Sequence, residues 1–182
     1  LKALKFFEDV NNQYGMANCH INIGSVYGSI EEDAKARSHY EQAYKIYLAI
    51  SNKRGIALSL NNIGAIDTKT DDYIKARDAF VKALAIYEEI NDAEGIDMAN
   101  VNIAESYHKT FEYKEALDYA FKALAVAKSS DSPEGMAYDY KAISEIYYGM
   151  ASEGDGNSQH TNATTDRSTA LKRAGLYADS AI

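Results

Sequence analysis

Apolar and polar positions alternate along the chain with the period of an amphipathic helix, in stretches of about 15 to 18 residues. Consecutive stretches form pairs. The two stretches of a pair are joined by a short acidic turn, such as Glu31-Glu32-Asp33 or Asp71-Asp72. Clusters of Asn, Asp and Ser separate one pair from the next. The sequence therefore predicts a series of helical hairpins.

The hairpins recur at a regular interval of about 40 residues. This period is carried by four glycines, Gly15, Gly55, Gly95 and Gly135. The same interval separates four isoleucines, Ile23, Ile63, Ile103 and Ile143, and a small residue follows each of them. A single hairpin cannot bury its apolar face alone, so we expect neighbouring hairpins to stack into a solenoid with a continuous core.

The repeat divides the chain into five segments. Residues 1–14 match the second helix of a truncated upstream repeat, and the units that follow are 15–54, 55–94, 95–134 and 135–182. The last unit carries an insertion around 151–165, because Tyr177, which matches Tyr119 of the preceding unit, comes later than one repeat length allows. Apolar helix faces at both ends would lack a polar cap, so we expect the chain to be a fragment of a longer protein.

Small residues recur where the two helices of a hairpin should cross. Ile23, Gly24 and Tyr27 share one face of the first helix. Ala36, Tyr40 and Ala43 would supply the facing surface of the second helix, so the small residue at position 24 lets the two backbones approach closely.

These residues resemble the tetratricopeptide repeat, in which an aliphatic–small pair is followed by Tyr, Ala, an aromatic residue and a second Ala. Asp67 departs from the pattern at the tyrosine position. The 40-residue unit is longer than the usual 34 and resembles the variant found in bacterial signalling and regulatory proteins. The resemblance implies an all-α fold, a right-handed α-solenoid of stacked antiparallel helix hairpins, and a noncatalytic scaffold that binds protein or peptide in its concave groove.

The resemblance also implies that one face of the first helices lines this groove. The candidate binding residues on these helices are Asn18, Asn22, Ser25, Asn61, Asn62, Met98, Asn102, Glu105, Tyr138, Lys141 and Glu145. Asn22, Asn62 and Asn102 occupy one register, and an amide there can both donate to and accept from the backbone of an extended peptide. The alternative is that these amides hydrogen-bond only to a neighbouring helix. Ala142 interrupts the register in the last unit.

The charge narrows the class of partner. With 27 acidic against 19 basic side chains, the net charge is −8, which disfavours nucleic acid and favours a basic or neutral protein ligand. No apolar run approaches the length of a membrane span, so we expect no membrane insertion. We expect a cytoplasmic protein, with a periplasmic sensor segment as the alternative. Cys19 is the single cysteine, which excludes an intramolecular disulfide.

The sequence assembles no nucleophile with a base, no phosphate-binding loop and no paired catalytic carboxylates, so we expect neither an enzyme nor a cofactor. The four histidines show no metal-ligand spacing with Cys19 and are expected to be scattered and structural. The insertion only loosely matches a calcium loop, since His160 and Asp166 replace its glycine and glutamate. Asp67 is expected to be a partly exposed residue near Lys69, although it could also face the groove.

Two further functions stay open. The segment could be the sensory or regulatory part of a bacterial signalling protein, because similar arrays occur in histidine kinases, nucleotide cyclases, transcription regulators and peptide-controlled phosphatases. It could also self-associate through the open ends of the solenoid, where Phe6 and Phe7 would lie unpaired.

Overall fold

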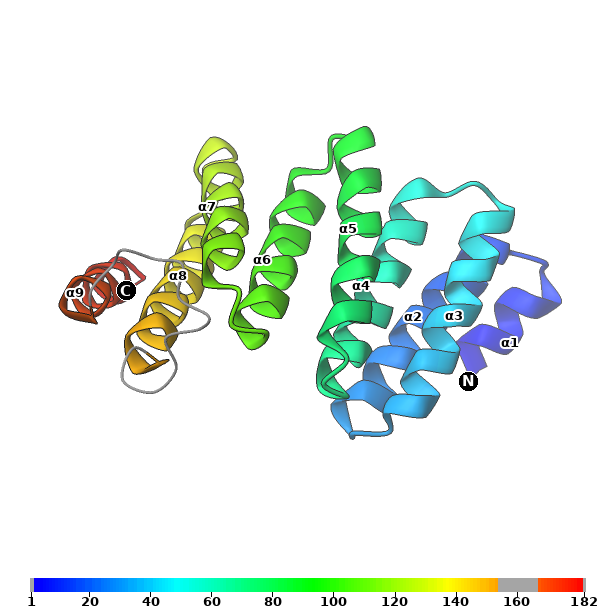
Figure 1. The fold of residues 1–182 in the computed structure, drawn as a ribbon. Coiled ribbons are helices and arrows are strands. Elements are labelled where there is room, and N and C mark those ends of the chain that lie inside the picture. The colour runs from blue at the N-terminus through cyan, green and yellow to red at the C-terminus, as the bar shows by residue number, and fades with distance from the viewer. Residues whose placement is uncertain (1, 154–166, 182) are drawn as a thin grey trace. The chain divides into compact units, whose positions relative to one another are not determined.

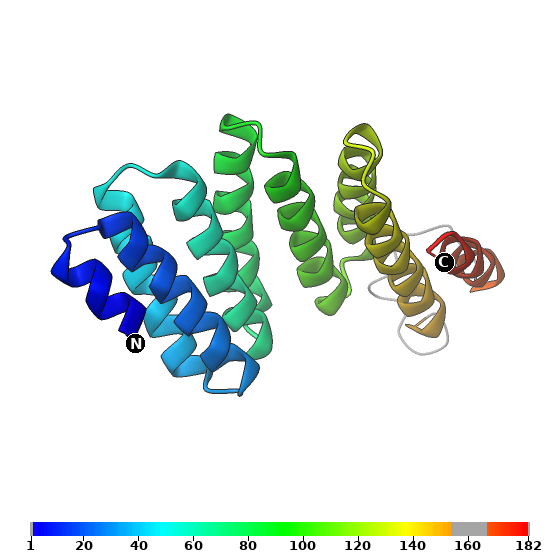
Figure 2. The ribbon, with the colours of Figure 1, turned by 180° about the vertical axis from the view of Figure 1, so that it is seen from behind.

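The computed structural model describes residues 2–153 and 167–181, and all regular secondary structure in these ranges is helical (Figures 1 and 2). The helices are α1 (Lys2–Asp9), α2 (Gln13–Ser29), α3 (Asp33–Ala49), α4 (Lys53–Lys69), α5 (Tyr73–Glu89), α6 (Ala93–Lys109), α7 (Tyr113–Ser129), α8 (Pro133–Glu153) and α9 (Arg167–Ser180). Most of the insertion expected at 151–165, with His160 and Asp166 of the calcium-loop comparison, lies outside the described residues.

The helices form two compact units, Leu1–Asp92 and Ala93–Ile182, which we call unit 1 and unit 2. In unit 1 each helix from α1 to α5 packs against the next. In unit 2 the consecutive helices α6 to α9 do the same, and α6 also contacts α8. Within each unit, successive helices run antiparallel (Figure 1). The predicted all-α fold of stacked antiparallel hairpins is confirmed.

The turns between helices share one geometry. One residue with positive φ stands in each described turn, at Asn11, Glu31, Ser51, Asp71, Asn91, Phe111 and Asp131, so these residues recur at half the repeat interval. After each of them, a backbone N–H closes the preceding helix, as Glu32 N does by donating to Tyr27 O at 2.9 Å. Several turns then open the next helix with a side-chain cap, since Oδ1 of Asn12 accepts from Gly15 N at 2.8 Å. Because these turns are evenly spaced along the chain, every helix from α2 to α7 has the same length of 17 residues.

The first-helix glycines make room for aromatic rings, whereas the sequence analysis expected them to let the two helix backbones approach closely. A Cβ atom on Gly24 would lie 2.6 Å from Cε1 of Tyr40, and one on Gly64 would lie 2.6 Å from Cε1 of Phe80. Gly15 lies against the ring of Phe7 in the same way. Phe7 is therefore packed in the chain itself, and of the two phenylalanines expected to lie unpaired only Phe6 is exposed, at 59%.

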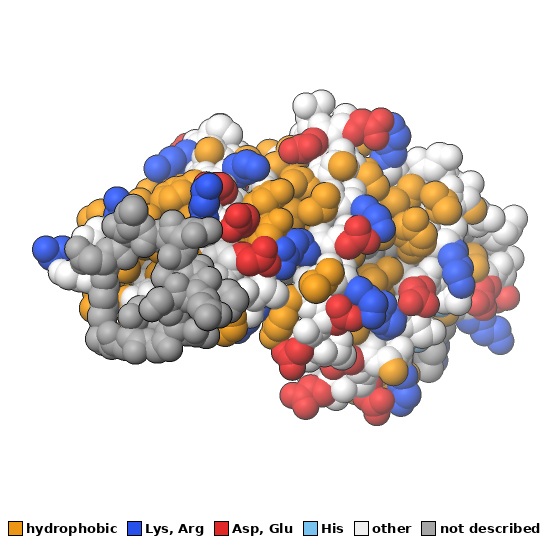
Figure 3. Space-filling view, in the orientation of Figure 1, with side chains coloured by type: hydrophobic (Ala, Val, Ile, Leu, Met, Phe, Trp, Pro, Cys, Tyr) orange, Lys and Arg blue, Asp and Glu red, His pale blue; other side chains and the backbone are white. Residues whose placement is uncertain are grey.

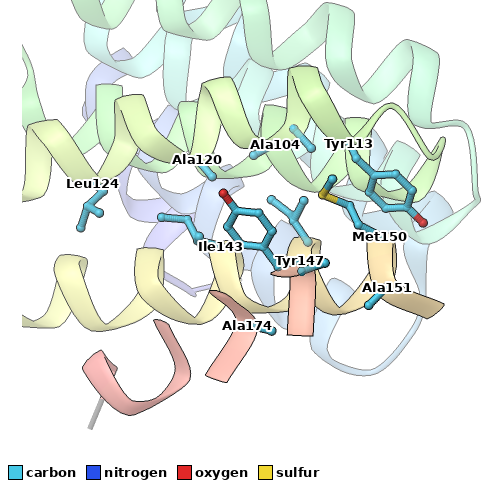
Figure 4. Close-up of a cluster of buried hydrophobic side chains, with 12 residues drawn as sticks. Ala104, Tyr113, Ala120, Leu124, Ile143, Tyr147, Met150, Ala151 and Ala174 are labelled. Carbon is cyan, nitrogen blue, oxygen red and sulfur yellow. The ribbon is translucent and has the colours of Figure 1, made fainter. Parts of the chain in front are cut away.

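Each unit has its own apolar core. In unit 1 the alanines at the helix crossings are surrounded by Tyr40, Tyr47 and Ile66. In unit 2, Ile143, Tyr147 and Met150 of α8 face Tyr113 and Ala120 of α7 (Figure 4). Helix α9 completes this core on the other side of α8 with Ala170 and Ala174. Helices α8 and α9 thus form the last hairpin, although the insertion separates them along the chain.

Candidate functional site

In unit 1, three of the predicted groove residues are engaged in the fold. Asn18 accepts a hydrogen bond through Oδ1 from the hydroxyl of Tyr47 at 2.6 Å. Ser25 donates to Ile21 O at 3.1 Å and accepts from the hydroxyl of Tyr40 at 3.3 Å. Asn61 is buried, with 5% of its surface exposed. These three side chains connect helices or lie in the interior, so we leave them out of the candidate site.

The side chains of Asn22 and Asn62 are not engaged in the fold in this way. Asn22 is exposed and Asn62 is half-buried. Within the described part of the chain, neither side-chain amide forms a hydrogen bond to another residue. Both amides therefore have donors and acceptors that no other described residue uses. Asn102, the third member of the register, is half-buried in unit 2 and interacts with other residues, as does Met98.

In unit 2, the other four predicted residues come together around one pocket of about 200 Å³. Helices α6 and α8 form its walls, and we call it the α6–α8 pocket. It is lined by Val101, Glu105, His108, Tyr138, Lys141, Ala142, Glu145 and Ile146. Val101 and Ile146 are buried and supply an apolar floor, whereas Glu105, Tyr138, Lys141 and Glu145 are exposed at the rim.

The sequence analysis missed His108 and the apolar floor. His108 stands one helical turn after Glu105, so the spacing alone could have added it to the list. The sequence offered no reason to select Val101 and Ile146, because buried aliphatic residues occupy the core positions of any helical repeat. The α6–α8 contact that places them opposite each other is a long-range feature of the fold.

The rim of the α6–α8 pocket is electrically mixed. Burial, followed by the charges of Glu105, Glu145 and Asp139, raises the pKa of the Tyr138 phenol. Burial and then the charge of Lys109 lower the pKa of His108, so its imidazole is neutral at pH 7. Lys141 Nζ lies 3.8 Å from Glu145 Oε1. On the face drawn in Figure 3, acidic and basic side chains are interspersed with apolar ones.

A larger pocket of about 850 Å³ adjoins the first, and Glu105, His108 and Glu145 line both. Its other walls include Phe111, Tyr148 of α8 and Leu171 of α9, all partly exposed apolar residues. A third pocket of about 570 Å³ shares Tyr138, Lys141 and Glu145 with the first and reaches Ala178 and Ala181 beyond it. The face between α6, α8 and α9 is therefore a series of connected hollows.

Two carboxyl groups, the buried Asp139 and the half-buried Asp97, lie on the helices of this face but do not line its pockets. Asp139 of α8 is 1% exposed, and neither of its oxygens has a hydrogen-bond partner among the described residues. Burial, together with the charge of Asp97 in α6, raises the pKa of Asp139 to about 8. The pKa of Asp97 is also raised by burial. The sequence carries a signal for this pair, because one repeat earlier both positions are alanine, Ala57 and Ala99.

Two expectations about unit 1 were wrong. Asp67 is buried at 7% exposed and forms an ion pair with Arg37 of α3, whereas Lys69 contacts Gly28 O and Asp33. A buried carboxylate needs such a partner because desolvation penalises an isolated charge.

Two of the three described histidines are not scattered, since Nδ1 of His20 lies 2.9 Å from Nδ1 of His39. Burial is the first cause that lowers the pKa of each ring in this pair. Among the described residues, no group of three or more His, Cys, Asp or Glu side chains is placed to hold a metal ion.

Comparison with known proteins agrees with this architecture. The sequence model of the tetratricopeptide repeat family matches residues 55–129, which confirms the resemblance for that part of the chain. Tetratricopeptide repeats are generally noncatalytic scaffolds whose usual role is to bind proteins. No curated protein matches the sequence. Among the described residues, no helix is long and apolar enough to cross a bilayer.

Two solved structures share the fold. BtubC (BKLC) from P. vanneervenii is 15% identical with a TM-score of 0.73, and aspartyl phosphate phosphatase F from Bacillus subtilis is 18% identical with a TM-score of 0.68. Each alignment covers 93% of this chain. The chain spans 63% of the first structure and 49% of the second.

Proposed function

We propose that the chain is a noncatalytic module that binds a protein or peptide along the face of its first helices, as part of a larger protein. The observation that carries this proposal is the convergence of Glu105, Tyr138, Lys141 and Glu145 on the α6–α8 pocket. Exposed polar groups around an apolar floor suit side-chain recognition. The unengaged amides of Asn22 and Asn62 suit recognition of a peptide backbone in unit 1.

The test is a selection of short random peptides displayed on phage against the whole chain. Selected peptides are synthesised and their affinity is measured by fluorescence anisotropy. We expect micromolar binders that lose about tenfold in affinity when Glu105 and Glu145 are both replaced by alanine, because charge-assisted hydrogen bonds are lost. The matched control replaces Glu115, an exposed glutamate of α7 outside the pocket, and leaves affinity unchanged. Peptides that bind the double variant as well as the parent contradict the proposal.

A second candidate is the sensory or regulatory segment of a bacterial signalling protein. It is supported by the shared fold with aspartyl phosphate phosphatase F, half of whose length the chain spans. In this role the same peptide-binding face would control a catalytic or DNA-binding domain elsewhere in the protein. The noncatalytic assignment, which both candidates share, is tested by incubating the chain with a receiver domain phosphorylated on aspartate. Faster loss of the acyl phosphate would overturn the noncatalytic assignment, and unchanged loss supports it.

A further inference from the structure

We propose that the α6–α8 pocket accepts one arginine side chain of the bound partner. This inference rests on the proposed function and names the chemistry that the pocket selects. The volume of the pocket is about 200 Å³. It is below the range of roughly 300 to 1,000 Å³ typical of whole small-molecule sites. A pocket of this size suits a single side chain of a larger ligand.

The lining matches the two parts of an arginine side chain. Val101 and Ile146 form an apolar floor for the methylene stem. Glu105 and Glu145 stand on different helices at the rim and offer carboxylates to the guanidinium. The exposed ring of Tyr138 adds a surface on which a planar cation can stack. Lysine would meet the same carboxylates, but its compact, strongly hydrated ammonium lacks the bidentate and stacking contacts.

The formal charge of the α6–α8 pocket also favours an arginine side chain. Two glutamates and one lysine leave a formal charge of −1, since His108 is neutral at pH 7. Lys141 balances Glu145 only weakly, because their 3.8 Å pair is exposed at 68% and 59% of the two side chains. A guanidinium would neutralise the remaining charge and compete with Lys141 for Glu145. The ammonium group of Lys141 thus lies beside Glu145, where we propose that the guanidinium of the ligand binds.

The adjoining larger pocket indicates which kind of residue lies next to the arginine in the bound peptide. It shares Glu105 and Glu145 with the α6–α8 pocket and continues between Tyr148 and Leu171, whose exposed surfaces are apolar. A bulky apolar side chain near the arginine in the same peptide would bury these surfaces. The recognised segment therefore combines one arginine with a neighbouring apolar residue, in keeping with the chain's net charge of −8.

The probe for the arginine subsite is N-acetyl-arginine-N-methylamide, titrated into the whole chain and followed by amide NMR. We expect saturable shifts confined to residues around Glu105, Tyr138 and Glu145, with roughly millimolar affinity for a ligand of this size. The citrulline analogue has nearly the same shape without the charge, and we expect it to bind about tenfold more weakly. Glu145→Gln should weaken the arginine probe similarly, whereas Glu115→Gln should not.

Lys141→Ala gives the sharpest outcome, because removing the internal cation should strengthen arginine binding by up to about fivefold. A purely structural role of Lys141 would not produce this gain. No shifts at the pocket, equal binding of the citrulline analogue, or weaker binding to Lys141→Ala would each overturn the inference. If display-selected peptides bind without arginine and still depend on Glu105 and Glu145, the arginine subsite fails while the proposed function stands.

Discussion

The hydroxyl of Tyr47 in α3 donates a 2.6 Å hydrogen bond to Oδ1 of Asn18 in α2. This bond joins the two helices of one hairpin, and the Tyr47 side chain is almost fully buried, at 1% exposed. The ring of Tyr47 also fills the space left by Gly55 of the next hairpin. One tyrosine thus fixes the packing of two hairpins, and the amide it holds serves the fold.

Tyr47→Phe removes only the hydroxyl, so the ring still fills the space beside Gly55. We expect the free energy of unfolding to fall by about 1 kcal/mol, because the half-buried acceptor of Asn18 loses its partner. Urea denaturation followed by circular dichroism measures this loss. Peptide affinity should stay unchanged, and a drop in affinity at unchanged stability would return Asn18 to the binding surface.

Gly64→Ala tests the ring-on-glycine contacts. The new methyl would lie 2.6 Å from Cε1 of Phe80, so the ring or the helix must shift, at a cost of about 1 to 3 kcal/mol. Gly175→Ala in α9 is the matched control, because nothing lies within 4 Å of its Cβ position. There, higher helix propensity should stabilise the protein by about 0.5 to 1 kcal/mol. Effects of the same sign at both positions would contradict the packing described here.

The positive φ values in the turns predict that replacing serine by glycine changes the free energy of unfolding in opposite directions at Ser51 and Ser38. Ser51 has a φ of 55°, in the left-handed region that glycine adopts without strain. Ser51→Gly should therefore raise the free energy of unfolding by up to about 1 kcal/mol. Ser38→Gly, at an exposed position inside α3, should lower it by about 0.5 kcal/mol. Equal losses at both serines in thermal unfolding would argue against the left-handed turn.

The Asp97–Asp139 pair predicts that the free energy of unfolding falls as the pH rises from about 4 to about 8. The pKa of Asp139 is raised from 3.8 to about 8 in the folded state. Between these values the folded chain holds a proton that the unfolded chain has released, so stability falls as pH rises through this window. Asp139→Asn removes this proton and should flatten the decline while raising stability at pH 8.

The urea midpoints of the parent and of the Asp139→Asn variant are measured at each pH from 5 to 9. The quantity compared is the difference between the two midpoints at each pH. The difference is needed because the lowered pKa values of His20 and His39 act in the opposite direction, destabilising the folded state below about pH 6.5. Parallel pH profiles for parent and Asp139→Asn would rule out a proton held by the pair.

The sequence was sufficient for features that recur at the repeat period. Gly24 and Tyr40 share one pattern with Gly64 and Phe80, so the close helix crossings were predictable. The Arg37–Asp67 and His20–His39 contacts occur once each, and single pairs across helices leave no periodic signal.

The site was predictable only in part. Glu105, Tyr138, Lys141 and Glu145 line the α6–α8 pocket, and the sequence analysis included them because the resemblance assigns a face to each first helix. The amides of Asn18 and Asn61 stand on the same helices but face packing partners, and neighbouring positions on a helix are easily confused without coordinates. The contribution of Leu171 was out of reach, because the insertion interrupts the register before α9.

Hydrogen–deuterium exchange of the whole chain, with and without a display-selected peptide, tests most directly whether the first-helix face is the binding surface. The account predicts slower exchange in α6 and α8 around Glu105 and Glu145, with α7 unchanged as the internal reference. Protection confined to α7, or to the turns at Ser51 and Asp131, would contradict it.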